Sequence, residues 1–160
     1  MMRISCLLSI AGVALLGCGR GTTVTDAEGT QTTVTERGDG VEMTVTGEDG
    51  QTLKFAGDEA GVPLPDGFPS DVPIYAGATV VASMTLPGGM NVTLKTGDPQ
   101  EKVRAYYETQ LKANGWEVQA TMNTADGAML QTQKENRSVN VVIGRDEATT
   151  IHLTVTQQDP

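Results

Sequence analysis

The second half of the chain alternates apolar and polar residues, a pattern typical of β-strands with one buried face. Between residues 90 and 96, Met90, Val92 and Leu94 share one face, and the residues between them are polar. Turn-forming residues such as Pro87-Gly88 separate successive runs. The pattern predicts six strands, over residues 80–86, 90–96, 116–121, 128–134, 138–143 and 149–156.

One segment between these runs has helical spacing instead. Asp98 is suited to the N-cap position, Pro99 to the first helical position, and Glu101 to the third. Asn114-Gly115 is a typical helix end. The apolar stripe has members at i, i+3, i+4 and i+8, namely Val103, Tyr106, Tyr107 and Leu111.

Residues 74–160 are therefore predicted to form an α+β domain. The expected sheet is antiparallel, has about six strands in the order β-β-α-β-β-β-β, and carries one helix packed on one face. The aromatic residues Tyr106, Tyr107 and Trp116 belong to the core between helix and sheet in this interpretation. They are also the candidate binding residues, because the same three rings could line a ligand groove.

Residues 18–61 form a separate predicted unit, an acidic arm rich in Thr and Gly. Thr-Val-Thr runs recur at intervals of 10 to 11 residues, and pairs such as Asp39-Gly40 separate them. Asp-Gly between β-branched runs favours hairpin turns. The arm is thus expected to be a weak β-meander, partly disordered where only Val24 and Val34 are apolar, and to act as a spacer.

Residues 62–73 are predicted to be a linker, since four prolines in twelve residues oppose both helix and strand pairing. The stretch that follows Pro69 reads Asp-Val-Pro-Ile-Tyr-Ala-Gly-Ala over residues 71–78. This phrase resembles the D-V-P-x-Y-x-G-A-type opening of a domain in a family of uncharacterised bacterial lipoproteins. The resemblance covers roughly residues 64–156. It implies a small α+β domain and no known activity.

The first 17 residues are predicted to be a signal peptide for Sec export. Arg3 precedes an uncharged apolar run over residues 4–16, too short to span a bilayer comfortably. The run ends in Leu15-Leu16-Gly17-Cys18, which resembles a bacterial lipobox and makes Cys18 the expected lipidation site, modified by palmitate or a similar acyl chain. The alternative is a plain secretory signal. Gly at position 19, in place of Asp, favours the outer membrane if the cell is Gram-negative.

The composition and the absence of known motifs argue against several classes of function. A formal net charge of −9 opposes binding to nucleic acid. The chain has a single histidine, His152, and two cysteines. A Cys/His zinc cluster is therefore not expected. The sequence shows neither a phosphate-binding glycine loop nor a G-x-S-x-G motif. We expect no catalytic residues, metal or cofactor.

The expected function is that of a membrane-anchored bacterial lipoprotein that is not an enzyme. Lipidated Cys18 would anchor it to a membrane of the cell envelope. Its α+β domain would bind a protein, an envelope polymer or an apolar ligand. Two alternatives stay open: an envelope enzyme of hydrolase type with an unrecognised site, and a purely structural spacer.

Overall fold

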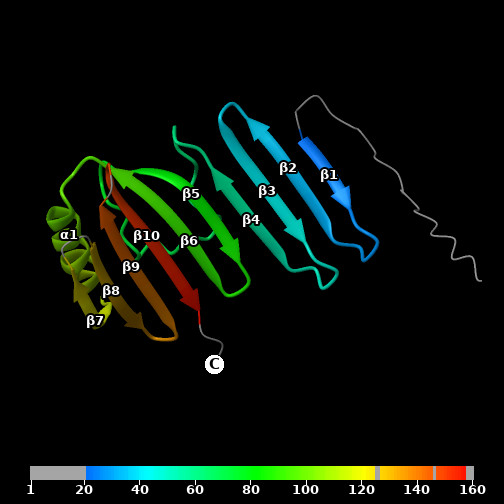
Figure 1. Ribbon diagram of the computed structural model, residues 1–160. Coiled ribbons are helices and arrows are strands. Elements are labelled where there is room, and N and C mark those ends of the chain that lie inside the picture. The colour runs from blue at the N-terminus through cyan, green and yellow to red at the C-terminus, as the bar shows by residue number, and fades with distance from the viewer. Residues whose placement is uncertain (1–20, 125–126, 146, 158–160) are drawn as a thin grey trace, which may run out of the picture.

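A computed structural model describes residues 21–157 apart from 125, 126 and 146. These residues form one antiparallel sheet of ten strands with a single helix (Figure 1). The strands are β1 (Gly21–Thr25), β2 (Gln31–Arg37), β3 (Gly40–Thr46), β4 (Thr52–Gly57), β5 (Thr79–Leu86), β6 (Gly89–Thr96), β7 (Glu117–Asn123), β8 (Gly127–Lys134), β9 (Arg137–Arg145) and β10 (Thr149–Gln157), and the helix is α1 (Gln100–Ala113). Their order across the sheet is β1-β2-β3-β4-β5-β6-β10-β9-β8-β7.

The predicted fold class, an α+β domain with a sheet of about six strands, is wrong. The protein is mostly β, because the acidic arm supplies four further strands to the same sheet. β4 pairs with β5 from Lys54 opposite Thr85 to Gly57 opposite Ala82. A six-stranded sheet would leave the amides and carbonyls of β5 unpaired at its edge, and β4 satisfies them.

The arm is accordingly a continuation of the sheet from β1 to β4. Its apolar side chains share one face, where Val34, Met43, Phe55 and Met84 stand opposite one another in successive strands. These side chains are half-buried, and no second layer among the described residues covers them. The arm is therefore a single-layer sheet stabilised by strand pairing more than by a core.

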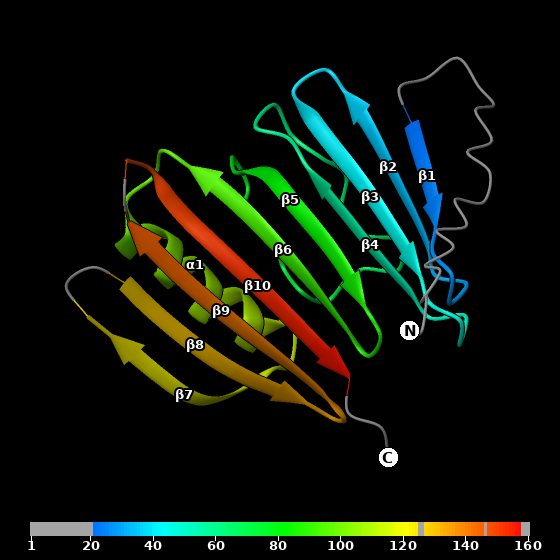
Figure 2. The ribbon, with the colours of Figure 1, turned by 45° about the vertical axis from the view of Figure 1, so that its right-hand side comes forward.

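The hydrophobic core lies between α1 and the other half of the sheet. α1 crosses one face of β7, β8 and β9 (Figure 2). Its inward residues Val103, Tyr107 and Leu111 are fully buried. They meet inward side chains of β6, β8, β9 and β10 that are equally buried, namely Val92, Leu94, Leu130, Val139, Val141, Ile143, Ile151 and Leu153.

The start of α1 differs from the prediction. Pro99 occupies the N-cap position, and no side chain caps the helix. Asp98 is used elsewhere: it accepts a hydrogen bond of 2.7 Å from the Tyr75 hydroxyl and pairs with Lys102 at 3.0 Å. The C-terminal end is as expected, with Gly115 at a φ of 82° and the Trp116 amide bonded to the Leu111 carbonyl at 2.9 Å.

Candidate ligand-binding groove

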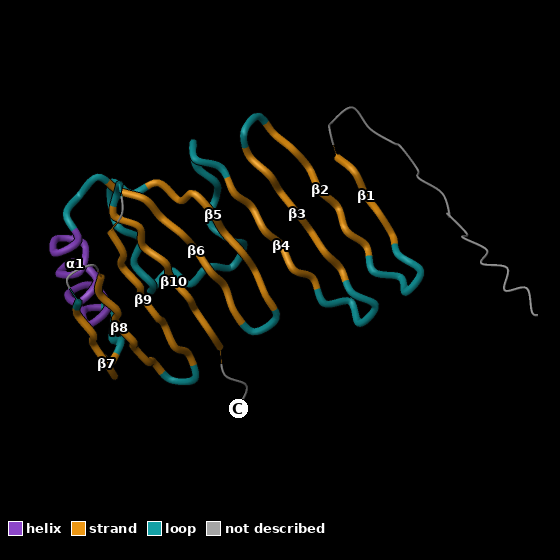
Figure 3. Tube along the Cα trace, viewed as in Figure 1, coloured by secondary structure: helices purple, strands orange, loops and turns teal. Residues whose placement is uncertain are grey.

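The proline-rich segment, defined here as residues 62–78, joins β4 to β5 and forms the long loop between them in Figure 3. Val72 and Tyr75 are buried in the core, and Phe68 and Ile74 pack against it. The Tyr106 hydroxyl donates a hydrogen bond of 2.9 Å to the Ile74 carbonyl. The segment is therefore an ordered part of the domain surface.

Asp71 holds this segment in place through both its carboxylate and its carbonyl. The Arg137 guanidinium donates two hydrogen bonds to the carboxylate, at 2.9 and 2.7 Å, and the Lys134 ammonium donates a third at 2.8 Å. The carbonyl accepts hydrogen bonds of 3.0 Å from the side chains of Asn114 and Trp116. We call these five residues the Asp71 clamp.

The clamp brings two cations to one carboxylate, so it carries a net positive charge. The hydrogen bonds from Arg137 hold the pKa of the Asp71 carboxyl well below its usual range, and those from Lys134 act in the same direction. The carboxylate in turn raises the pKa of Arg137. Both cations lie over the Trp116 ring, with Arg137 at 5.1 Å and Lys134 at 5.9 Å from its centroid. The clamp is thus a partly buried network of ion pairs whose two cations lie over the Trp116 ring.

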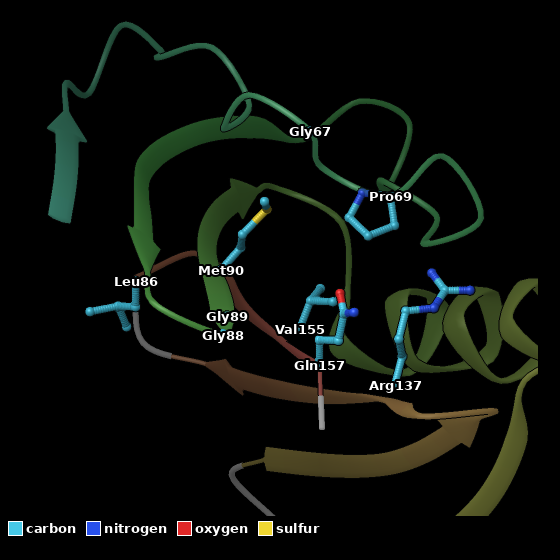
Figure 4. Close-up of a pocket in the computed structure, with 9 residues that line it drawn as sticks. All are labelled: Gly67, Pro69, Leu86, Gly88, Gly89, Met90, Arg137, Val155 and Gln157. Carbon is cyan, nitrogen blue, oxygen red and sulfur yellow. The ribbon is translucent and has the colours of Figure 1, made fainter. Parts of the chain in front are cut away.

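Beside the clamp, a groove of about 380 Å³ opens between the proline-rich segment and the end of the sheet. Figure 4 shows Met90, Val155 and Gln157 on the side of the sheet, with Pro69 across from them. Leu86 and Arg137 also line it, and the wall is completed by glycines of the segment and of the β5–β6 turn, namely Gly67, Gly88 and Gly89. The lining is mostly apolar, with one cation and one amide.

Glycine at position 67 lets the chain turn beside the groove. Gly67 has a φ of 77°, which side-chain-bearing residues rarely adopt. A methyl group there would come within 3.8 Å of the Met90 Cε atom inside the groove. The turn of the chain therefore requires glycine, whereas a methyl group would make only ordinary van der Waals contact with Met90.

The predicted binding residues Tyr106, Tyr107 and Trp116 do not line this groove. Tyr107 and Trp116 are buried in the core, and the rings of Tyr75, Tyr106 and Tyr107 stack edge to face at 5.0 and 5.4 Å. The Tyr107 hydroxyl lies near the backbone of Tyr75 without a hydrogen bond of good geometry, and burial raises its pKa. A binding role for the three aromatic residues stays a prediction.

Sequence reasoning missed the groove and the clamp. Asp71 is not among the candidate site residues of the sequence analysis, although it lies in the D-V-P phrase. Its partner Arg137 is 66 residues away, and nothing in the local pattern connects the two. The groove residues Met90 and Val155 were assigned to strands, correctly, but their proximity to Pro69 depends on how the linker folds back.

Some predicted features lie outside the described residues or stay untested. Cys18 and the signal peptide over residues 1–17 precede the described part of the chain. Within that part, no helix is both long and apolar enough to cross a bilayer. The same residues contain no cluster of three metal-binding side chains. His152 lies on the face opposite the helix, where its Nδ1 atom is 3.1 Å from the Thr93 hydroxyl.

The comparisons with known proteins point to the same half of the molecule. A protein family described as START domain-like matches residues 79–157, which run from β5 to β10 and include α1. The match covers just under half of the chain, and it suggests a ligand-binding fold. Among the curated proteins and the solved structures, none matches the chain.

Proposed function

We propose that residues 62–157 form a binding domain, without catalytic activity, that holds a small uncharged apolar ligand in the groove beside the Asp71 clamp. The single observation that carries this proposal is the mostly apolar groove of about 380 Å³, at the lower end of the 300–1,000 Å³ typical of ligand sites. The START-like match supports it, since it suggests a ligand-binding fold.

Electrostatics favour an uncharged ligand. Among the described residues that line the groove, Arg137 alone is charged, and its guanidinium is already paired with Asp71 through two hydrogen bonds. The net charge of −9 repels anions at long range. An anionic head group would therefore gain little from Arg137, whereas the Gln157 amide can donate to or accept from a neutral polar group.

Packing directs the ligand to the groove rather than to the interface between helix and sheet. Val103, Tyr107 and Leu111 fill that interface, and each is fully buried. A ligand placed beneath α1 would have to displace them. The groove, in contrast, is bounded on one side by the loop at Pro69, which can adjust to a ligand more cheaply than a packed core can.

A solvatochromic dye can test the site. We expect the uncharged dye Nile red to bind the full chain carrying Cys18→Ala, a background in which no acyl chain competes for the groove. Met90→Trp should weaken dye binding at least about tenfold, because the indole fills the groove. The matched control is Met122→Trp, on the face opposite the helix, which should leave the affinity unchanged.

The control also separates the two apolar surfaces of the domain. Met122, Met129 and Val142 form a shallow patch on the outer face, with Met122 58% exposed. If Met122→Trp weakens dye binding and Met90→Trp does not, the ligand site is on the outer face and the proposal is wrong. Absence of dye binding to the parent chain would also contradict it.

We further propose that the protein is held at a membrane through acylated Cys18. This rests on the apolar run that ends in Leu15-Leu16-Gly17-Cys18. In fractionated cells the native chain should be found with membranes and carry acyl mass, and Cys18→Ala should release it into the soluble fraction. Equal solubility of the two chains, with no acyl mass on the native one, would contradict the anchor.

A further inference from the structure

β1 forms one edge of the sheet and is open to solvent. All five of its residues are exposed, and Val24 retains 58% of its accessible surface. Within the described residues β1 pairs only with β2, from Gly21 opposite Thr35 to Thr25 opposite Gln31. Its second row of amides and carbonyls is therefore available to another strand.

This edge lacks the usual protection against strand pairing. β1 reads Gly-Thr-Thr-Val-Thr, without a charged residue or a proline, and its pairing with β2 runs without a register shift. The opposite edge, β7, begins with Glu117 and has an irregularity between Val118 and Ala120. Charges and bulges discourage edge-to-edge association, so β1 is the open edge of the two.

The sequence of β1 complements itself. Residues 22–25 read Thr-Thr-Val-Thr, and residues 32–35 of β2 repeat the same four letters. In the antiparallel β1–β2 pair, Thr22 stands opposite Val34 and Val24 opposite Thr32, and the central Thr23 meets its counterpart Thr33 with hydroxyls 3.0 Å apart. β1 therefore already pairs, inside one chain, with a copy of its own sequence.

We infer that β1 is a dimerisation strand, whose partner is β1 of a second copy of this chain. The strands pair antiparallel with Thr23 on the twofold axis, so Thr22 lies opposite Val24 of the partner subunit. Each contact reproduces a β1–β2 contact, and about four to six backbone hydrogen bonds form, depending on which amides face outward. The two sheets then join into one continuous sheet.

Charge placement permits this arrangement. Asp26 is the acid that follows β1 directly along the chain. Its carboxylate accepts hydrogen bonds of 3.0 Å from the backbone amides of Glu28 and Thr30. The twofold axis at Thr23 puts the two acidic turns at opposite ends of the paired strands. The long-range repulsion between two chains of formal charge −9 opposes association, and salt screens this repulsion.

Sedimentation velocity on the full chain in detergent, over a concentration series and at two salt concentrations, tests the pairing. We expect a reversible dimer that strengthens with added salt. Thr23→Lys places two ammonium groups face to face on the axis and should raise the dissociation constant about tenfold. The matched control, Thr33→Lys, puts the same charge on the same sheet face one strand inward and should dimerise like the native chain.

A charge swap distinguishes pairing at the axis from general repulsion. An equimolar mixture of Thr23→Lys and Thr23→Asp chains should form a heterodimer at least as stable as the native dimer, although each variant alone is weakened. A native chain that stays monomeric throughout the series overturns the inference. So does a mixture that fails to associate, or a Thr23→Lys chain that dimerises as strongly as the native one.

Discussion

Asp71 joins three parts of the chain at a single carboxylate. It lies in the proline-rich segment, Lys134 ends β8, and Arg137 begins β9. The side chains of the three residues are each about three-quarters buried. At such a depth the loss of one partner leaves the other charges insufficiently solvated, so the cost exceeds that of an exposed ion pair.

Asp71→Asn is expected to lower the free energy of unfolding by about 2 kcal/mol at neutral pH, because Arg137 and Lys134 lose their counter-ion. The pKa of Asp71 is lowered in the folded state, below the unfolded value of about 3.9. Its contribution is therefore complete at neutral pH and is lost as the pH falls below about 5. Urea unfolding at pH 7 and pH 3 should show a smaller difference between variant and native chain at pH 3.

Asp66→Asn is the matched control in the same segment. The Asp66 side chain is 97% exposed, and its pair with Lys54 is 3.5 Å long. Its removal should change the unfolding midpoint only slightly at either pH.

A second carboxyl also contributes to the pH dependence of the native chain. The hydrogen bonds from Tyr75 and Lys102 lower the pKa of Asp98, so acid weakens the native chain there too. Equal pH dependence of the Asp71→Asn and native chains would contradict the role assigned to the clamp.

At the scale of elements, α1 is attached through a narrow stripe. Val103, Tyr107 and Leu111 lie on the sheet, whereas Lys102 is exposed and Tyr106 is half-buried at the stripe edge. Tyr106 reaches the proline-rich segment through its hydroxyl and packs its ring against Tyr75. The helix therefore contacts the sheet through its buried stripe and contacts the proline-rich segment through Tyr106.

Tyr107→Ala should lower the free energy of unfolding by about 3 to 5 kcal/mol, since it removes a fully buried ring. Tyr106→Ala should cost less, and Lys102→Ala almost nothing. Tyr107→Phe should leave stability unchanged or slightly increased, because the buried hydroxyl lacks a well-formed hydrogen bond. Chemical denaturation of the four variants gives this ranking, and an unchanged midpoint for Tyr107→Ala would show that the stripe does not anchor the helix.

Across the whole molecule, the sheet extends further than the hydrophobic core does. The sheet runs without interruption from β1 to β7, but every residue of the hydrophobic core lies between Val72 and Val155. The arm adds hydrogen bonds and half-buried side chains, and no second layer covers its apolar face in the part of the chain that the structure describes. Because single-layer strands bury little apolar surface, the arm depends on the rest of the sheet for its order.

Residues 62–160 are therefore expected to fold in isolation, and residues 19–61 are not. The longer piece should show dispersed amide signals in NMR and one cooperative unfolding transition, at a midpoint below that of the full chain because β5 becomes an open edge. The arm piece should show the narrow dispersion of an unfolded chain. A well-dispersed arm, or an unfolded longer piece, would contradict the boundary at residue 62.

The alternation and capping signals along the chain are sufficient to locate the elements and the buried face of each strand. The six strands predicted after residue 79 are found within two residues of their expected ends, and α1 begins at Gln100, one residue later than expected, because Pro99 is the N-cap. Val92 and Leu94 in β6, and Ile151 and Leu153 in β10, point inward as alternation predicts. Local patterns carry this information because the periods of two and 3.6 residues follow from backbone geometry alone.

Which strands are neighbours follows from the folded structure and not from local sequence patterns. Backbone hydrogen bonds are the same for every sequence, so alternation identifies a strand and its buried face without identifying its partner. The β4–β5 pairing, which makes one sheet of ten strands, and the position of β10 between β6 and β9 are of this kind. So are the Asp71 clamp and the groove at Met90, which exist because the proline-rich segment folds back on the sheet.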